Sequence, residues 1–227
     1  MSDVKRDGRM SFATATYGFV GASVLVLGLA ASAVFWSRSE TVIDEALDLA
    51  VRLRTEAAGE SFARLLHEDW VDLGFLARAA GGLEGEDIGN LLEGVRGNGS
   101  RMSWVGYADV DGVVLEASDD LLVGADVSER PWFRNGLRSG FAGDVHDAAL
   151  LARMLRPEGG DPLRFIDLAL PVRNAENEVQ GVVGMHIDAS WAEQTLAETG
   201  RMLGIDLYLI NAAGDVVMTS GDTAPAA

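Results

Sequence analysis

The sequence predicts an α+β protein with a membrane-spanning helix, a long amphipathic helix and a small antiparallel sheet flanked by shorter helices. Three observations support this fold class. An uncharged apolar run occupies residues 17–36. Apolar side chains then recur at helical spacing through residues 38–80. Two strand pairs joined by polar turns follow between residues 102 and 188.

The first element is the apolar run. No residue from Ser11 to Ser37 is charged, and about 20 apolar residues suffice to cross a bilayer as a helix. Tyr17 and Trp36 stand at its two ends, where amphipathic rings favour the interface. The span is therefore expected at residues 17–36.

The flanking residues predict its orientation. Residues 1–16 carry the basic side chains of Lys5, Arg6 and Arg9, so this segment should stay in the cytoplasm. A cleaved signal peptide is the alternative, because residues 31–33 read Ala-Ser-Ala, but the apolar run exceeds the usual length of a signal core. We expect a single-pass protein of the inner (cytoplasmic) membrane, with the chain beyond the span in the periplasm or outside the cell.

Residues 38–80 follow as a long membrane-proximal helix. Its apolar side chains fall at three- and four-residue steps: Ile43, Leu47, Ala50, Leu53, Ala57, Phe62, Leu65, Leu66, Trp70, Leu73 and Leu76. Gly59 is a weak joint that would divide it into two helices, and Gly81-Gly82 should end it. Such a helix packs on its own domain or pairs with a second copy; both remain open, and a homodimer is expected.

Two hairpins form the predicted sheet. Asp111-Gly112 separates two apolar runs, and Gly accepts the positive φ of a tight turn. A second pair runs from Phe165 to Val172 and from Val179 to Ile187. After a helix over residues 190–203, residues 207–220 repeat the plan of the first hairpin, including its terminal Ser. This hairpin either completes the sheet of the first domain or opens a second module of the same kind.

The composition and the missing motifs exclude several classes of function. The 227 residues include 18 Lys and Arg against 35 Asp and Glu, a net charge of −17, so nucleic acid is not an expected partner. Metalloprotease, phosphate-binding and nucleophile-elbow motifs are missing, and so is cysteine. We therefore expect no enzyme activity and no cofactor.

Several motifs carry a family resemblance. They are Asp126–Phe133 (DVSERPWF), Gly143–Asp147 with Leu150–Ala152, Arg164–Asp167, Pro171-Val172 and Gly181–Asp188. With them, residues 102–191 resemble an extracytoplasmic Cache sensor domain, a PAS-like fold of bacterial receptors. The resemblance implies a sensor domain over residues 81–203, and residues 204–227 resemble the opening of the membrane-proximal module of a double Cache domain. Such proteins usually continue into a second span and an output domain such as a diguanylate cyclase, histidine kinase or chemoreceptor signalling domain.

Arg130 is the leading candidate for a ligand contact. Its guanidinium matches a carboxylate in a bidentate way, and Trp132 and Phe133 would wall a pocket. The alternative is that Arg130 pairs with Asp126 or Glu129 while the two aromatic rings fill the core. Cache domains that bind amino acids typically carry a Tyr five residues before the Arg; Ala125 stands there in this sequence, so that pattern is incomplete.

Further candidates lie on either side of Arg130 in the sequence. Asp147, by its place in the Cache pattern, would take a ligand ammonium, with His146 beside it. Asp126 belongs to the same motif as Arg130, and Tyr107 either borders the pocket or caps a strand. The spacing Asp-x-His-Asp is too short for a recognised metal site. His186 shares a strand face with Val182 and Gly184 and is interpreted as a hydrogen-bonded structural histidine.

These features together predict a membrane-anchored sensor. It would bind a small molecule, such as a carboxylate or an amino-acid-like compound, outside the cytoplasm and signal across the membrane. The alternative is a stand-alone membrane-tethered protein that docks on a partner receptor through an unpaired edge of its C-terminal hairpin.

Overall fold

The computed structural model describes residues 11–83, 85–147 and 163–221. The basic N-terminal residues and the Leu150–Ala152 motif lie outside these ranges. The chain divides into two compact units, Met1–Leu53 and Arg54–Ala227. The fold is α+β, with a long N-terminal helix and an antiparallel sheet, which confirms the predicted class.

Helix α1 runs without a break from Phe12 to Ala80. It passes straight through Gly59, so the weak joint allowed by the sequence is absent. Among the described residues α1 is the one helix long and apolar enough to cross a membrane, and none of its most apolar 18-residue window is buried. Gly81 ends the helix at a point where a Cβ would collide with the carbonyl oxygen of Arg173, so only glycine allows the end of α1 to approach the sheet this closely.

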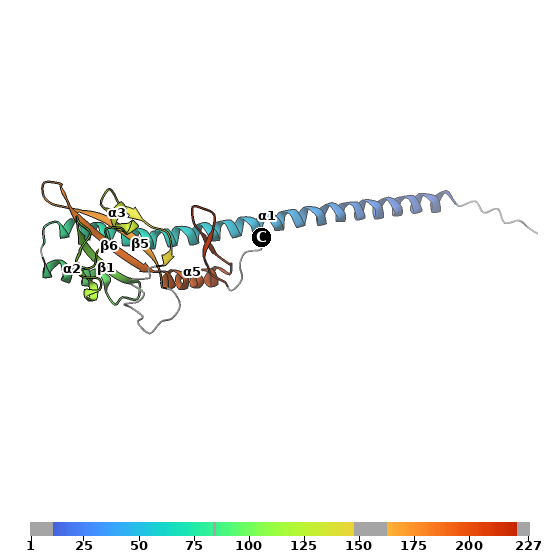
Figure 1. Ribbon diagram of the computed structural model, residues 1–227. Coiled ribbons are helices and arrows are strands. Elements are labelled where there is room, and N and C mark those ends of the chain that lie inside the picture. Colours follow the sequence, from blue (N-terminus) through green and yellow to red (C-terminus); the bar gives the residue numbers. More distant parts are fainter. Residues whose placement is uncertain (1–10, 84, 148–162, 222–227) are drawn as a thin grey trace, which may run out of the picture. The chain divides into compact units, whose positions relative to one another are not determined.

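The second unit contains the sheet (Figure 1). Its strands are β1 (Met102–Asp109), β2 (Val114–Ala117), β3 (Phe141–Ala142), β4 (His146–Asp147), β5 (Arg164–Arg173) and β6 (Val179–Asp188). The order is β2-β1-β6-β5-β3, and β4 also pairs with β5. All pairs are antiparallel. Both predicted hairpins are confirmed, β1 with β2 and β5 with β6.

Shorter helices flank these strands in the sequence: α2 (Glu86–Arg96) before β1, a 3-10 turn (Ser118–Asp120) and α3 (Pro131–Gly136) between β2 and β3, and α5 (Ala189–Leu203) after β6. Pro131 occupies the first turn of α3, where its missing N–H costs nothing. Asp188 caps α5 by accepting a hydrogen bond from the Ser190 backbone N–H at 2.7 Å. Gly204 ends α5 in the left-handed conformation.

The sheet separates two apolar clusters because side chains alternate along its strands. On β6, Val183, Met185 and Ile187 belong to the cluster that contains Leu73 and Leu76 of α1. Val182 lies in the other cluster, with Trp132 and Phe133 of α3. We call these two sides the α1 face and the α3 face.

A buried ion pair ties the start of β1 to α1. The Arg101 guanidinium donates to a carboxylate oxygen of Asp69 and to the carbonyl oxygen of Leu65, each at 2.6 Å. It also lies 4.2 Å from the ring centre of Trp191 on α5. Asp69 is 2% exposed. One cation therefore links α1, the sheet and α5.

The C-terminal hairpin, β7 (Tyr208–Ile210) with β8 (Val216–Thr219), pairs with no other described strand. Its hydrogen bonds repeat those of the first hairpin at an offset of 102 residues. Ser118 accepts from the Val105 N–H at 3.1 Å and Ser220 accepts from the Leu207 N–H at 2.7 Å. The Asp109 carboxylate and the Asn211 side-chain amide oxygen each accept two backbone N–H bonds within their own turns.

The buried carboxyl of Asp69 predicts a pH dependence of stability. Burial raises its pKa from 3.8 to about 6, although Arg101 acts in the opposite direction. Between these two values the folded state holds more protons than the unfolded chain, so the unfolding free energy falls as pH rises, by up to about 3 kcal/mol. D69N keeps an acceptor for Arg101 but cannot titrate.

We therefore expect D69N to flatten the pH dependence of the unfolding free energy between about pH 4 and about pH 6. Urea denaturation of the full chain in detergent measures this. E60Q, which removes an exposed carboxylate from the same helix, is the control and should keep the slope of the parent protein. An identical slope in D69N and the parent would contradict the assignment.

Candidate functional site

Five side chains gather on the α3 face of the sheet. They are Trp104 (β1), Trp132 (α3), Phe165 and Asp167 (β5) and His186 (β6), each at most 5% exposed. The His186 ring stacks on Trp104 with centroids 4.8 Å apart and meets the Trp132 ring edge-on at 5.9 Å. His186 Nδ1 lies 2.5 Å from a carboxylate oxygen of Asp167. The arrangement is an aromatic enclosure around one acid–imidazole pair.

Strand register creates this cluster. His186 is the Cα partner of Trp104 on one side and of Asp167 on the other. Two glycines leave room for the large rings. A Cβ on Gly184 would come within 2.8 Å of Trp132, and one on Gly106 would collide with the Trp104 ring. The indole N–H of Trp104 donates to the Leu121 carbonyl oxygen at 2.8 Å, so this ring is fixed.

His146 approaches the same carboxylate from β4. Its Nε2 lies 3.3 Å from the second carboxylate oxygen of Asp167. Its Nδ1 lies 3.2 Å from the carbonyl oxygen of Asp144. The His146 side chain is 43% exposed, so it forms the solvent-facing side of the cluster.

Arg130 stands exposed at the residue before α3. Neither Asp126 nor Glu129, the two carboxylates proposed as alternative partners of Arg130, has a recorded contact with it. Glu129 lies 3.5 Å from Arg134, and the Asp126 carboxylate accepts from the Ser128 N–H at 2.8 Å. Those hydrogen bonds to Ser128 lower the pKa of Asp126. Within the described ranges the structure records no ion pair for the Arg130 guanidinium.

The remaining predicted residues occupy different places. Trp132 and Phe133 are buried on the α3 face. Tyr107 belongs to the α1 face, where its hydroxyl donates to the Gln180 carbonyl oxygen at 3.0 Å; burial, followed by the charge of Asp109, raises its pKa. Tyr107 is thus on the opposite side of the sheet from Trp132.

Asp147 is exposed on β4, paired in register with Arg164. The guanidinium of Arg164 contacts Glu193 of α5 and the Val217 carbonyl oxygen. Nowhere in the described ranges do three or more His, Asp or Glu side chains come together as metal ligands.

Sequence reasoning did not single out Asp167 or Trp104 for the site. The two-residue alternation of side chains along the strands contains part of the information needed to predict them. The sequence pattern places His186 on one face with Val182 and Gly184, and the same two-residue period applied to β5 and β1 adds Asp167 and Trp104. The contact with His146 needs the position of β4, which no periodicity gives.

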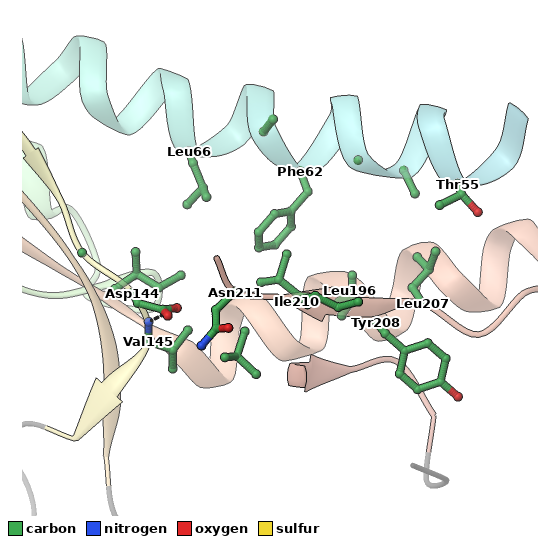
Figure 2. A pocket seen from close by; sticks show the side chains of 17 residues that line it. Thr55, Phe62, Leu66, Asp144, Val145, Leu196, Leu207, Tyr208, Ile210 and Asn211 are labelled. Atoms are coloured by element: carbon green, nitrogen blue, oxygen red, sulfur yellow. Dashed lines mark hydrogen bonds between the residues drawn. The ribbon is translucent and has the colours of Figure 1, made fainter. Parts of the chain in front are cut away.

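A second candidate is an apolar groove of about 400 Å³ between α1, α5 and the β7–β8 hairpin (Figure 2). Phe62 points from α1 into it, toward Ile210. Leu66, Leu196 and Leu207 add to the wall. The groove offers apolar surface and few polar groups, unlike the α3 face.

No protein-family model matches the chain, and no curated protein matches it. Solved structures do. The ligand-binding domain of the Pseudomonas fluorescens chemoreceptor CtaA in complex with L-isoleucine has a TM-score of 0.62 at 18% identity, covering 78% of this chain and 70% of that one. The ligand-binding domain of the Pseudomonas aeruginosa amino acid chemoreceptor PctC in complex with GABA has a TM-score of 0.54 at 17% identity, covering 74% and 71%.

The sensory domain of the Campylobacter jejuni chemoreceptor Tlp3 has a TM-score of 0.57 at 14% identity, covering 74% of this chain and 69% of that one. At identities this low, the structural likeness establishes a shared fold and nothing further. The chain has the fold of the ligand-binding sensory domains of bacterial chemoreceptors, as the resemblance to Cache domains predicted.

Proposed function

We propose that this protein is a membrane-anchored sensor that binds a small carboxylate or amino-acid-like molecule on the α3 face and signals across the membrane. The observation that carries the proposal is the exposed guanidinium of Arg130, for which residues 11–83, 85–147 and 163–221 show no ion pair. Arg130 directly precedes the helix that brings Trp132 against His186. An exposed cation at the start of that helix is suited to a ligand carboxylate.

The comparison structures support this ligand class. Their ligands include L-isoleucine, L-serine and GABA, which all carry a carboxylate and an amine. In this chain Arg130 would hold the carboxylate at the start of α3, the helix whose Trp132 and Phe133 rings are buried on the α3 face. The exposed Asp126 carboxylate, four residues before Arg130, is the candidate for the ligand amine. Asp147 is also exposed, but it follows His146 on β4 and so points to the opposite side of that strand.

Signalling would pass through α1. The helix continues from the apolar run into the second unit without interruption, and Arg101 fastens β1 to it. A ligand that binds two arrangements of the sheet with different affinity would shift their populations, and α1 would carry the shift to the span.

We further propose that the β7–β8 hairpin opens a second module, as in a double Cache domain. The support is the repeated hydrogen-bond pattern of the two hairpins, which includes both the Ser contacts and the turn contacts. The tethered-partner alternative rests on the same hairpin, because the structure describes no third strand beside it. A partner strand would then complete its edge.

Residues of the first unit support a homodimer. Val42, Leu49 and Leu53 are 56–62% exposed and lie within about 40° of one another around α1. Two copies inserted in the same direction would bring these stripes together in parallel, as in a coiled coil.

The ligand assignment predicts a selective effect of Arg130. A thermal-shift screen of amino acids, amines and organic acids should give stabilising compounds, and R130A should weaken the best of them about 10-fold or more, because a charge-assisted contact is lost. R138A removes another exposed guanidinium just beyond α3 and should leave the affinity unchanged. A screen without stabilising compounds, or hits that bind R130A equally well, would contradict the proposal.

The dimer assignment predicts that L49E makes the full chain monomeric in detergent, because a charge would enter the paired stripe. V51E is the matched control, since residue 51 lies about 200° away from residue 49 around the helix. Light scattering after size-exclusion chromatography measures the mass. A parent protein that is monomeric at high concentration would refute the pairing.

A further inference from the structure

Asp167 is a buried acid whose recorded side-chain partners are two histidines. It is 3% exposed, with His186 on one carboxylate oxygen and His146 near the other. Burying a carboxylate without a counter-charge is strongly unfavourable, because the charge loses its hydration. The net charge of this part of the sheet therefore depends on whether His146 and His186 are protonated.

Permanent cations do not reach the cluster in the part of the chain that the structure describes. The Arg164 guanidinium on β5 contacts Glu193. Arg130 and Arg134, on either side of the start of α3, are exposed, and neither has a recorded contact with Asp167. Apart from Asp167, the side chains recorded against the His186 ring are uncharged aromatic rings: Trp104 from β1, Trp132 from α3 and Phe165 from β5.

The neighbours of the His146 ring favour its doubly protonated (imidazolium) form. Both of its ring nitrogens face oxygen atoms that can only accept, the Asp144 carbonyl at 3.2 Å and the Asp167 carboxylate at 3.3 Å. A neutral imidazole has one N–H, so one nitrogen would present a lone pair to an oxygen. The imidazolium form satisfies both. The Asp144 carboxylate itself accepts from the Val145 N–H at 2.8 Å and lines the apolar groove.

The surroundings of His186 also tolerate a positive charge. Its ring is stacked on the Trp104 indole, and an indole face attracts a cation. A proton shared among the two imidazoles and the carboxylate is therefore stabilised on both sides of Asp167.

We propose that His146, Asp167 and His186 form a proton-binding site whose occupancy changes near neutral pH, giving the sensor a second input. Histidine is the side chain that titrates in this range. Loss of the proton would leave Asp167 without a counter-charge and release His146. His146 belongs to the two-residue strand β4, which pairs only with β5 among the described strands. Proton occupancy would thus control the attachment of β4 to the sheet, with or without a small-molecule ligand.

The chain is suited to a direct test because it has three histidines. His67 lies exposed on α1 and serves as the internal reference. With histidine rings labelled with carbon-13, NMR of the full chain in detergent follows each ring as pH is varied without ligand. We expect at least one ring of the cluster to titrate, and D167N to move its midpoint to lower pH because the anionic neighbour is gone. The midpoint of His67 should stay unchanged.

D111N is the matched control. It removes an exposed carboxylate from the turn at the opposite end of β1 and should shift neither cluster histidine. Should D167N fail to fold, H146Q replaces it, and the His186 midpoint should then move because the two rings share one carboxylate. Cluster histidines that do not titrate, or that keep their midpoints in these variants, would overturn the proposal. Since no ligand is added, this outcome is independent of the ligand screen.

Discussion

The structure depends on one constraint, the two-residue period of β5 and β6. Because alternate side chains of these strands point to opposite sides, the same ten-residue strand supplies Met185 to the packing on α1 and His186 to the cluster under α3. A shift of register by one residue would exchange the two sets and bury the wrong side chains on both faces. The period therefore separates a structural face from a chemical face.

Arg101 connects the strand that carries part of the α3-face cluster to helix α1. It precedes β1, which carries Trp104 into the cluster, and it is held by Asp69 on α1 and by Trp191 on α5. The cation gains a charge partner and an aromatic face, which offsets part of the cost of burying Asp69. Movement of β1 would therefore be felt at α1 through a short and well-packed contact, as the proposed transmission along α1 requires.

Local patterns predicted the elements well, and contacts between distant segments escaped prediction. Asp111-Gly112 specifies its hairpin through turn chemistry alone. The break allowed at Gly59 did not occur, because the helix gains burial of Ala58 and Phe62 on either side, which outweighs the roughly 1 kcal/mol that glycine costs inside a helix. Tyr107 is a pocket candidate by its place in the sequence, but its two-residue spacing from Val105 assigns it to the α1 face. The Asp167 site joins three strands and includes His146 from the short β4, so no single stretch displays it.

The most direct test of the account locates the ligand through the five tryptophans of the chain. The indole N–H signals of the full chain in detergent would be followed by NMR while a stabilising compound is added. Binding on the α3 face predicts that Trp132 and Trp104 shift first and most, while Trp70 and Trp191, which pack on the α1 face, respond little. Shifts centred on Trp70 and Trp191, with Trp104 and Trp132 unchanged, would contradict the account and place the ligand on the other side of the sheet.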